Sequence, residues 1–189
     1  EQQRDMMTSV FKSQIPAMEK SDFLVMFEPV GATAQPIVIT QNEFMRRMKD
    51  MAAIQSGMAF YGELPDSYNL IVNTDHPLSQ KVIADTESAC KSELTPILDE
   101  LKTVNEEIER LQEAKKDKKD DEIPVADKEA LKHAEEKAKE LRAKESDILK
   151  TYADRTPLVR QLVDLALLSN NMLKGEALSK FIKRSVEML

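Results

Sequence analysis

The chain has 189 residues, 41% of them hydrophobic and 32% charged; this suffices for a core in one or two domains, yet no apolar run approaches the ~20 residues of a membrane span. The formal net charge of −7 argues against nucleic-acid binding, which depends on clustered Lys and Arg. The single cysteine, Cys90, excludes an internal disulfide framework and fits a reducing compartment, so we expect a cytoplasmic protein.

The first forty residues predict one helix and a pair of strands. Residues 1–15 have the apolar spacing of a short amphipathic helix, which Pro16 ends. Residues 22–30 (DFLVMFEPV) and 36–40 (PIVIT) are rich in strand formers and flank a small-residue turn, so we expect an antiparallel pair. Because the chain opens on EQQRD rather than methionine, and no signal peptide is visible, we also expect a piece of a longer protein.

A methionine-rich helix is predicted over about residues 41–56. Thr40 and Glu43 have the spacing of a capping box at its start. Methionine on a helix is commonly core filler, but several flexible thioethers beside a basic face and a glycine-punctuated loop also suit an adaptable binding surface. The candidate binding residues are Phe44, Met45, Met48 and Met51, and a further methionine, Met58, follows in the loop.

Residues 68–73 (YNLIVN) predict a third strand, and Thr74-Asp75-His76-Pro77 leads from it into a helix that starts near Leu78. With the first two strands this predicts an α+β fold, in which a small three-stranded sheet has helices on one face. An enzymatic interpretation would rest on His76 with Asp75 alone. A cap at the strand-to-helix junction explains both residues better, and replacing His76 by alanine would separate the two.

The pattern changes at residue 94, where apolar residues begin to alternate at spacings of three and four, as in a coiled coil. The first such series is Leu94, Ile97, Leu101, Val104, Ile108 and Leu111; the second is Leu131, Ala134, Ala138, Leu141, Glu145, Ile148 and Tyr152. The polar run KKDKKDDE separates them. We therefore predict an antiparallel helical hairpin over residues 94–155, inserted between an α+β part (1–93) and a terminal segment (156–189).

The terminal segment predicts two short helices joined by a tight turn. Thr156-Pro157 starts the first, whose sequence LVRQLVDLALL is apolar almost all round, and Gly175 precedes the second. Two copies of the pair would close a four-helix bundle in a homodimer, although the pair could instead cover the chain's own core. The candidate interface residues are Leu158, Leu162, Leu165, Leu168, Leu178, Phe181, Ile182 and Leu189.

Sequence motifs for catalysis, cofactors and metals are absent. The four glycines form no phosphate-binding loop, and no Cys/His cluster has metal-ligand spacing. His133 lies among charged residues of the predicted hairpin, where a solvated surface role is expected. Cys90, on an apolar helix face, is expected to be a small buried hydrophobe. We therefore expect no catalytic, cofactor-binding or metal-binding residue in this fragment.

Two stretches resemble the ninety-kilodalton heat-shock chaperones. YNLIVNTDHPLSQKV is similar to their strand and N-P-D-H-P junction, with Asn73, Asp75, His76 and Pro77 matching and Thr74 departing from the proline. LVRQLVDLALLSNNMLKGEALSKFIKRSVEML is similar to their final dimerisation helices, especially in bacterial members. The resemblance covers residues 1–93 and 156–189, because the hairpin is longer than the expected connection.

The resemblance implies a C-terminal domain that holds two chaperone protomers together. It places the methionine-rich helix where this family binds unfolded or partly folded client proteins. It also implies ATP and Mg in earlier domains, so that this fragment is not itself an enzyme. The chain ends at Leu189 without the acidic Met-Glu-Glu-Val-Asp tail, which favours the bacterial type and argues against docking of tetratricopeptide-repeat co-chaperones.

An alternative function is a coiled-coil adaptor that uses residues 94–153 as its interaction surface. Deleting the hairpin would distinguish the two: an adaptor would lose its partner, whereas a chaperone domain would still dimerise and contact clients.

Overall fold

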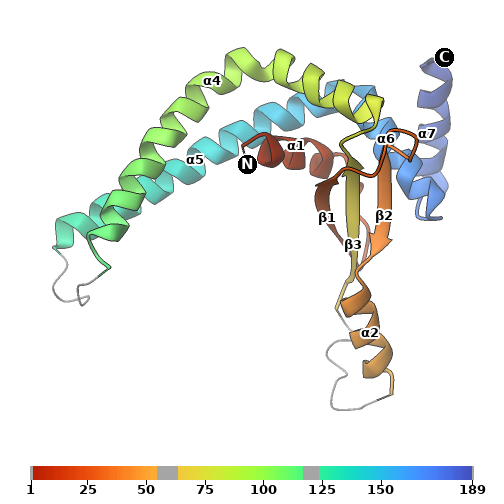
Figure 1. The fold of residues 1–189 in the computed structure, drawn as a ribbon, viewed down its shortest axis with the longest axis horizontal. Helices are drawn as coiled ribbons and strands as arrows, with labels where there is room; N and C mark the ends of the chain where they lie inside the picture. Colours follow the sequence, from red (N-terminus) through yellow and green to blue (C-terminus); the bar gives the residue numbers. More distant parts are fainter. Residues whose placement is uncertain (1, 55–63, 117–123, 189) are drawn as a thin grey trace. The chain divides into compact units, whose positions relative to one another are not determined.

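The computed structural model describes residues 2–54, 64–116 and 124–188 of the chain (Figure 1). They form a mixed α+β fold with two compact units, Glu1–Thr86 with Tyr152–Leu189, and Glu87–Thr151. The elements in chain order are α1 (Gln2–Ser13), β1 (Ser21–Glu28), β2 (Ile37–Gln41), α2 (Glu43–Ala52), β3 (Asp66–Asn73), α4 (Pro77–Glu113), α5 (Val125–Arg155), α6 (Pro157–Ser169) and α7 (Gly175–Glu187). The terminal helices α6 and α7 thus belong to the same unit as the sheet.

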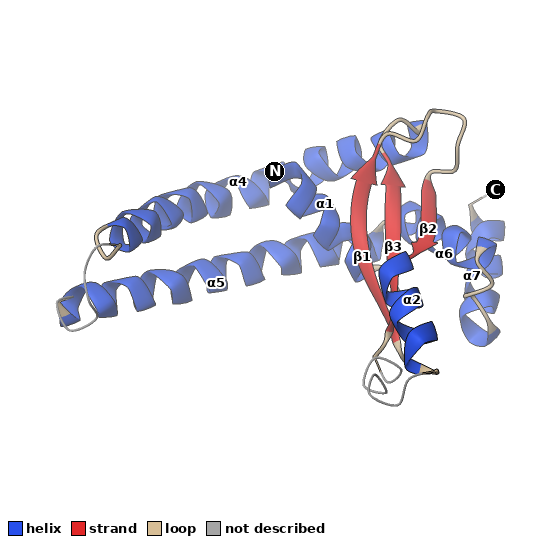
Figure 2. Ribbon diagram, turned by 60° about the horizontal axis from the view of Figure 1, so that its bottom comes forward, coloured by secondary structure: helices blue, strands red, loops and turns tan. Residues whose placement is uncertain are grey.

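The three strands form one sheet in the order β1-β3-β2 (Figure 2). β3 pairs parallel with β1 and antiparallel with β2, so the predicted antiparallel pair of the first two strands is wrong. The connection between β1 and β2 instead passes the end of β3, where Asn73 holds it. The Asn73 side chain accepts from Val30 N–H at 3.0 Å, and the Asn73 N–H donates to the Pro36 carbonyl at 2.9 Å.

The core of this unit lies on one face of the sheet. Its strands contribute aligned apolar side chains: Val25 of β1 and Ile39 of β2 both lie opposite Leu70 of β3, and Ile37 lies opposite Val72. α1 packs against β1 and α6 against β2, and the two helices also contact each other. The buried residues of the two helices are Met7, Val10 and Phe11 of α1, and Val159, Leu162, Val163, Asp164, Ala166 and Leu167 of α6.

The second unit, Glu87–Thr151, contains parts of the two long helices α4 and α5. Its buried cluster consists of Leu101, Val104, Ala134, Ala138 and Leu141, with Ile97 and Ile108 packed against it. All seven belong to the predicted three-and-four spacing. At the far end of α5 the buried positions are Leu149 and Ala153, whereas the predicted Ile148 and Tyr152 are half-buried. The buried line there advances in steps of four residues, which a regular seven-residue repeat does not anticipate.

Candidate functional sites on the terminal helices and the methionine helix

α6 begins as the sequence predicts and is covered on more than one side. Thr156 is its N-cap residue and Pro157 its first helical residue, but the Thr156 hydroxyl donates to the Tyr152 carbonyl at 2.9 Å rather than capping the helix. Six of its residues are buried in the single chain. Leu162, a candidate interface residue, is one of them and is only 3% exposed, so it packs in the chain's own core. Among the candidates on α6, Leu165 is 43% exposed, and Leu158 and Leu168 are half-buried.

α7 follows a turn in which Asn171 has a φ of 57°, and its first residue, Gly175, has a φ of 58°. Both values lie in the left-handed region that glycine and asparagine tolerate best. None of the residues described in α7 is buried. Leu178 and Phe181 are half-buried, and Ile182 is 54% exposed. Val186 and Met188 add exposed apolar surface at the end of the chain, whereas the candidate Leu189 lies outside the described residues. α7 therefore keeps an uncovered apolar side.

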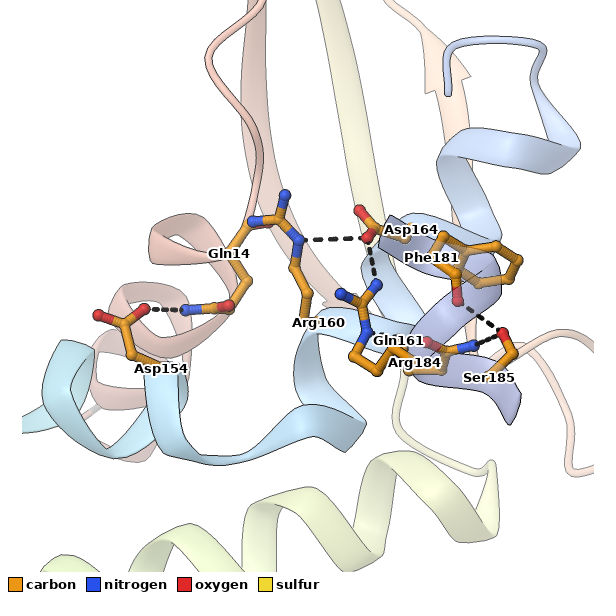
Figure 3. A network of polar contacts seen from close by, with 8 residues as sticks. All are labelled: Gln14, Asp154, Arg160, Gln161, Asp164, Phe181, Arg184 and Ser185. Atoms are coloured by element: carbon orange, nitrogen blue, oxygen red, sulfur yellow. Dashed lines mark hydrogen bonds and ion pairs between the residues drawn. The ribbon is translucent and has the colours of Figure 1, made fainter. Parts of the chain in front are cut away.

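A network of polar side chains fastens α7 to α6 (Figure 3). Asp164, on the buried side of α6, accepts through Oδ2 from Arg184 Nη2 of α7 at 2.6 Å and from Arg160 Nε at 3.2 Å. Arg184 Nε also donates to Gln161 Oε1 at 2.9 Å, and Gln161 Nε2 donates to Ser185 Oγ at 2.6 Å. Arg184 is thus held by two side chains of α6.

The same network continues to the segment after α1. Arg160 Nη1 donates to the Gln14 carbonyl at 2.8 Å, and Gln14 Nε2 donates to Asp154 Oδ1 at 2.9 Å. These side chains border an open depression of about 440 Å³. Sequence reasoning noted Asp164 only as a break in an apolar run. A lone carboxylate in such a helix was a usable signal for a buried ion pair, because buried charges need partners. The signal did not say which of the basic residues of the next helix supplies the partner.

α2, the methionine-rich helix, is shorter than predicted and begins with a different cap. Asn42 is the N-cap residue, and its side chain accepts from Met45 N–H at 3.2 Å. The predicted capping box at Thr40 is wrong, because β2 runs through that residue to Gln41. Polar contacts join α2 to β3: Asn42 N–H donates to the Ser67 carbonyl at 2.9 Å, and Lys49 Nζ lies 2.6 Å from Asp66 Oδ1.

The apolar side chains of α2 are not buried. Among the residues described in this helix, Phe44 is 63% exposed and Met51 is 42% exposed, while Met45 and Met48 are half-buried. Ile54, just after the helix, is 85% exposed and was not singled out from the sequence. The predicted methionine Met58 lies outside the described residues.

Charged residues of α2 pair with one another on its solvent side. Arg46 bonds to Glu43 and Asp50, and Arg47 bonds to Glu43. Hydrogen bonds from Arg46 and then Arg47 lower the pKa of Glu43 from its usual 4.5 to about 2. The helix therefore presents one charged, self-paired side and one set of apolar side chains open to contact.

The junction after β3 has a structural explanation. His76 is the residue before α4, and its Nδ1 accepts from Leu78 N–H at 3.1 Å, so the predicted capping role is confirmed. Asp75 Oδ2 accepts from Gly31 N–H at 3.0 Å. Asn73 is fully buried, and its Nδ2 donates to the Gly31 and Gln35 carbonyls. These side chains tie the loop before β2 to the start of α4.

The remaining candidate residues are also accounted for locally. Cys90 is buried, and this burial raises the pKa of its thiol, which disfavours the reactive thiolate. His133 is exposed on α5. Within the described ranges, no group of three His, Cys, Asp or Glu side chains is placed to hold a metal ion. No helix in those ranges combines the length and apolar character needed to cross a bilayer.

The curated proteins that match this chain are named as chaperones. The chain is 47% identical over 188 residues to the chaperone protein HtpG of Bacteroides thetaiotaomicron, covering 100% of this chain and 28% of that protein. It is 47% identical over 186 residues to the HtpG of Bacteroides fragilis strain 638R, covering 98% and 27%. It is 44% identical over 187 residues to the HtpG of Porphyromonas gingivalis strain ATCC 33277, covering 99% and 27%.

These matches extend the resemblance beyond the two stretches that carry it in the sequence. Because they cover 98–100% of the chain, they include the helical segment 94–155, which the sequence had set aside as a departure. The chain spans about a quarter of the length of these curated relatives. No protein-family model matches the chain, and no solved structure matches it significantly.

Proposed function

Because the chain belongs to the HtpG family of bacterial chaperones, as part of its C-terminal region, we propose that it joins two protomers through α6 and α7 and offers α2 to client proteins. We propose further that the longer protein is an ATP-dependent, cytoplasmic chaperone. In this proposal its ATP and Mg bind in parts of the longer protein outside this chain, as the resemblance implies.

The uncovered side of α7 is the observation that carries the dimer proposal. A thirteen-residue amphipathic helix with none of its described residues buried is poorly accounted for in a single chain. Ile182 and Val186 of α7 are 54% and 67% exposed, and Leu165 of α6 is 43% exposed. A second copy would cover these side chains on both protomers at once, as a two-fold interface does.

The dimer has a mechanical role in this proposal. Joining two protomers at one end raises the effective concentration of their other parts, so that transient contacts between those parts become intramolecular. In this role the terminal helices bind a second protomer and catalyse no reaction.

The client proposal depends on α2. Its thioethers are flexible and polarizable, so a small set of them can adapt to many apolar segments. Phe44, Met51 and Ile54 are exposed beside the half-buried Met45 and Met48, and together they offer weak contacts suited to partly unfolded chains.

Sedimentation of a charged variant tests the dimer. The double variant Leu165→Asp with Ile182→Asp should give a folded monomer, because both side chains are exposed in the single chain but would be buried between two copies. The matched control is Leu24→Asp with Ile54→Asp, which charges two other exposed apolar residues of the same unit and should remain dimeric. A Leu165/Ile182 variant that sediments as the parent does would refute this interface.

A further inference from the structure

We propose that the ion pair between Asp164 and Arg184 positions α7 for the dimer contact, so that these two residues control the strength of the dimer. The inference rests on the proposed dimer and goes further, because it identifies what holds the interface helix in place. Neither residue belongs to the exposed apolar surface that a second copy would cover.

α7 is attached to the rest of the chain mainly by polar contacts. α7 packs mainly on α6, and none of its described residues is buried. Its contacts with α6 include three side-chain hydrogen bonds, two of them from Arg184, to Asp164 and Gln161, and one between Gln161 and Ser185. Half-buried Leu178 and Phe181 give this attachment only limited apolar support. Polar contacts therefore carry much of it.

The ion pair between Asp164 and Arg184 is more buried than the two other ion pairs described on α7. The side chain of Asp164 is 2% exposed and that of Arg184 is 19% exposed, so water screens their interaction little. Lys180 with Glu176 and Lys183 with Glu187 are, by contrast, at least 63% exposed on every side chain. Exposed pairs of that kind contribute little to stability. The buried pair is the one able to fix the position of the helix.

Asp164 is itself fixed in position by a second arginine. It lies on the buried side of α6, and Arg160 bonds to the same oxygen while also donating to the Gln14 carbonyl. The other oxygen, Oδ1, is buried and has no hydrogen-bond partner among the described residues. Removing Arg184 would leave this carboxylate still less compensated, so the undocked position of α7 is disfavoured.

The position of α7 on α6 determines where the exposed apolar side chains of the proposed interface lie. Ile182 and Val186 lie within one turn of Arg184, one on either side of it. The side of α7 on which these two side chains are exposed therefore depends on the bonds that Arg184 makes to α6. If α7 moves on α6, the exposed side chains of the two helices no longer form a single fixed surface. A loose interface helix must be ordered again on association, which weakens binding.

Arg184→Met in the 189-residue chain is the test, with Lys183→Met as its matched control. Both remove one positive charge from neighbouring positions of α7, but Lys183 pairs only at 3.9 Å with an exposed Glu187. Arg184→Met should weaken the dimer about 10- to 100-fold by sedimentation, the range expected for losing charged hydrogen bonds. Lys183→Met should leave it unchanged, and Arg184→Lys should restore part of the loss.

A second measurement separates positioning from a general loss of fold. On the monomeric Leu165→Asp/Ile182→Asp background, Arg184→Met should speed hydrogen exchange of the α7 amides by a similar factor and leave α6 amides unchanged. Exchange unaffected in α7, or a dimer as strong as the parent's, would overturn the inference. A parent chain that is itself monomeric would instead overturn the proposed function.

Discussion

α6 and α7 are neighbouring helices of thirteen residues each, yet they differ in how far the rest of the chain buries them. Six residues of α6 are buried, including the charged Asp164, whereas none of the residues described in α7 is buried. Both helices have apolar periodicity, and both suggest a dimer interface from sequence. The spacing of apolar residues in a helix thus indicates how much apolar surface the helix has. It does not indicate whether the same chain or a second copy covers that surface.

α2 resembles α7 rather than α6. It also has none of its described residues buried, and like α7 it is joined to its unit by polar contacts, here Asn42 with Ser67 and Lys49 with Asp66. Two helices of this unit are thus fastened by charged or polar groups and keep apolar side chains exposed. An outside partner is proposed for both of them: a client protein for α2, and a second copy for α7 together with the exposed Leu165 of α6.

The largest expected effect comes from the buried side of α6. Leu167 is fully buried, so Leu167→Ala should lower the free energy of unfolding by about 2–5 kcal/mol. Ile182→Ala on α7 is the matched change, and in dilute, monomeric protein it should stay within about 0.5 kcal/mol of the parent. Urea unfolding measures both. Equal costs at the two positions would break the contrast between the helices.

A smaller effect on folding, but a clear one on function, is expected for α2. Replacing Met45, Met48 and Met51 together by alanine should leave the chain folded and dimeric, because none of the three is fully buried. The variant should suppress aggregation of an unfolded test protein less well than the parent. Leu24→Ala, an exposed apolar change on β1, is the control. A large drop in melting temperature with protection unchanged would mean that these methionines support the fold.

The smallest effect is a pH dependence of α2. The pKa of Glu43 is lowered to about 2 in the folded chain, so its ion pairs stabilise the helix fully above the usual value of 4.5 and lose that contribution as the pH falls through about 2. The protection of α2 amides, taken relative to the intrinsic exchange rate at each pH, should therefore fall as the pH drops between these values, and Glu43→Gln should remove that change. Exchange in α2 with the same pH profile in the parent and in Glu43→Gln would contradict the assignment.

The sequence predicted the local structure better than the partners of each element. It placed three strands and the junction cap at His76 correctly, because these depend on nearby residues. It paired the first two strands wrongly, since nothing local shows that β3 lies between them. It also assigned Leu162 to the dimer interface, although that side chain packs in the core. The contact of Asp164 with Arg184 joins two helices across a turn, so spacing along one helix could not reveal it.

The division of the sheet-containing unit between the two ends of the chain has a consequence for its synthesis. Residues 1–86 supply the strands, but α6, which packs against β2, is made only after residues 87–151. On the ribosome the N-terminal part emerges first, and long-range contacts form slowly. Ile37 and Ile39 of β2 therefore lack α6 beside them until the second unit has been translated. A protein proposed to shield the unfinished surfaces of other chains passes through the same exposed stage itself.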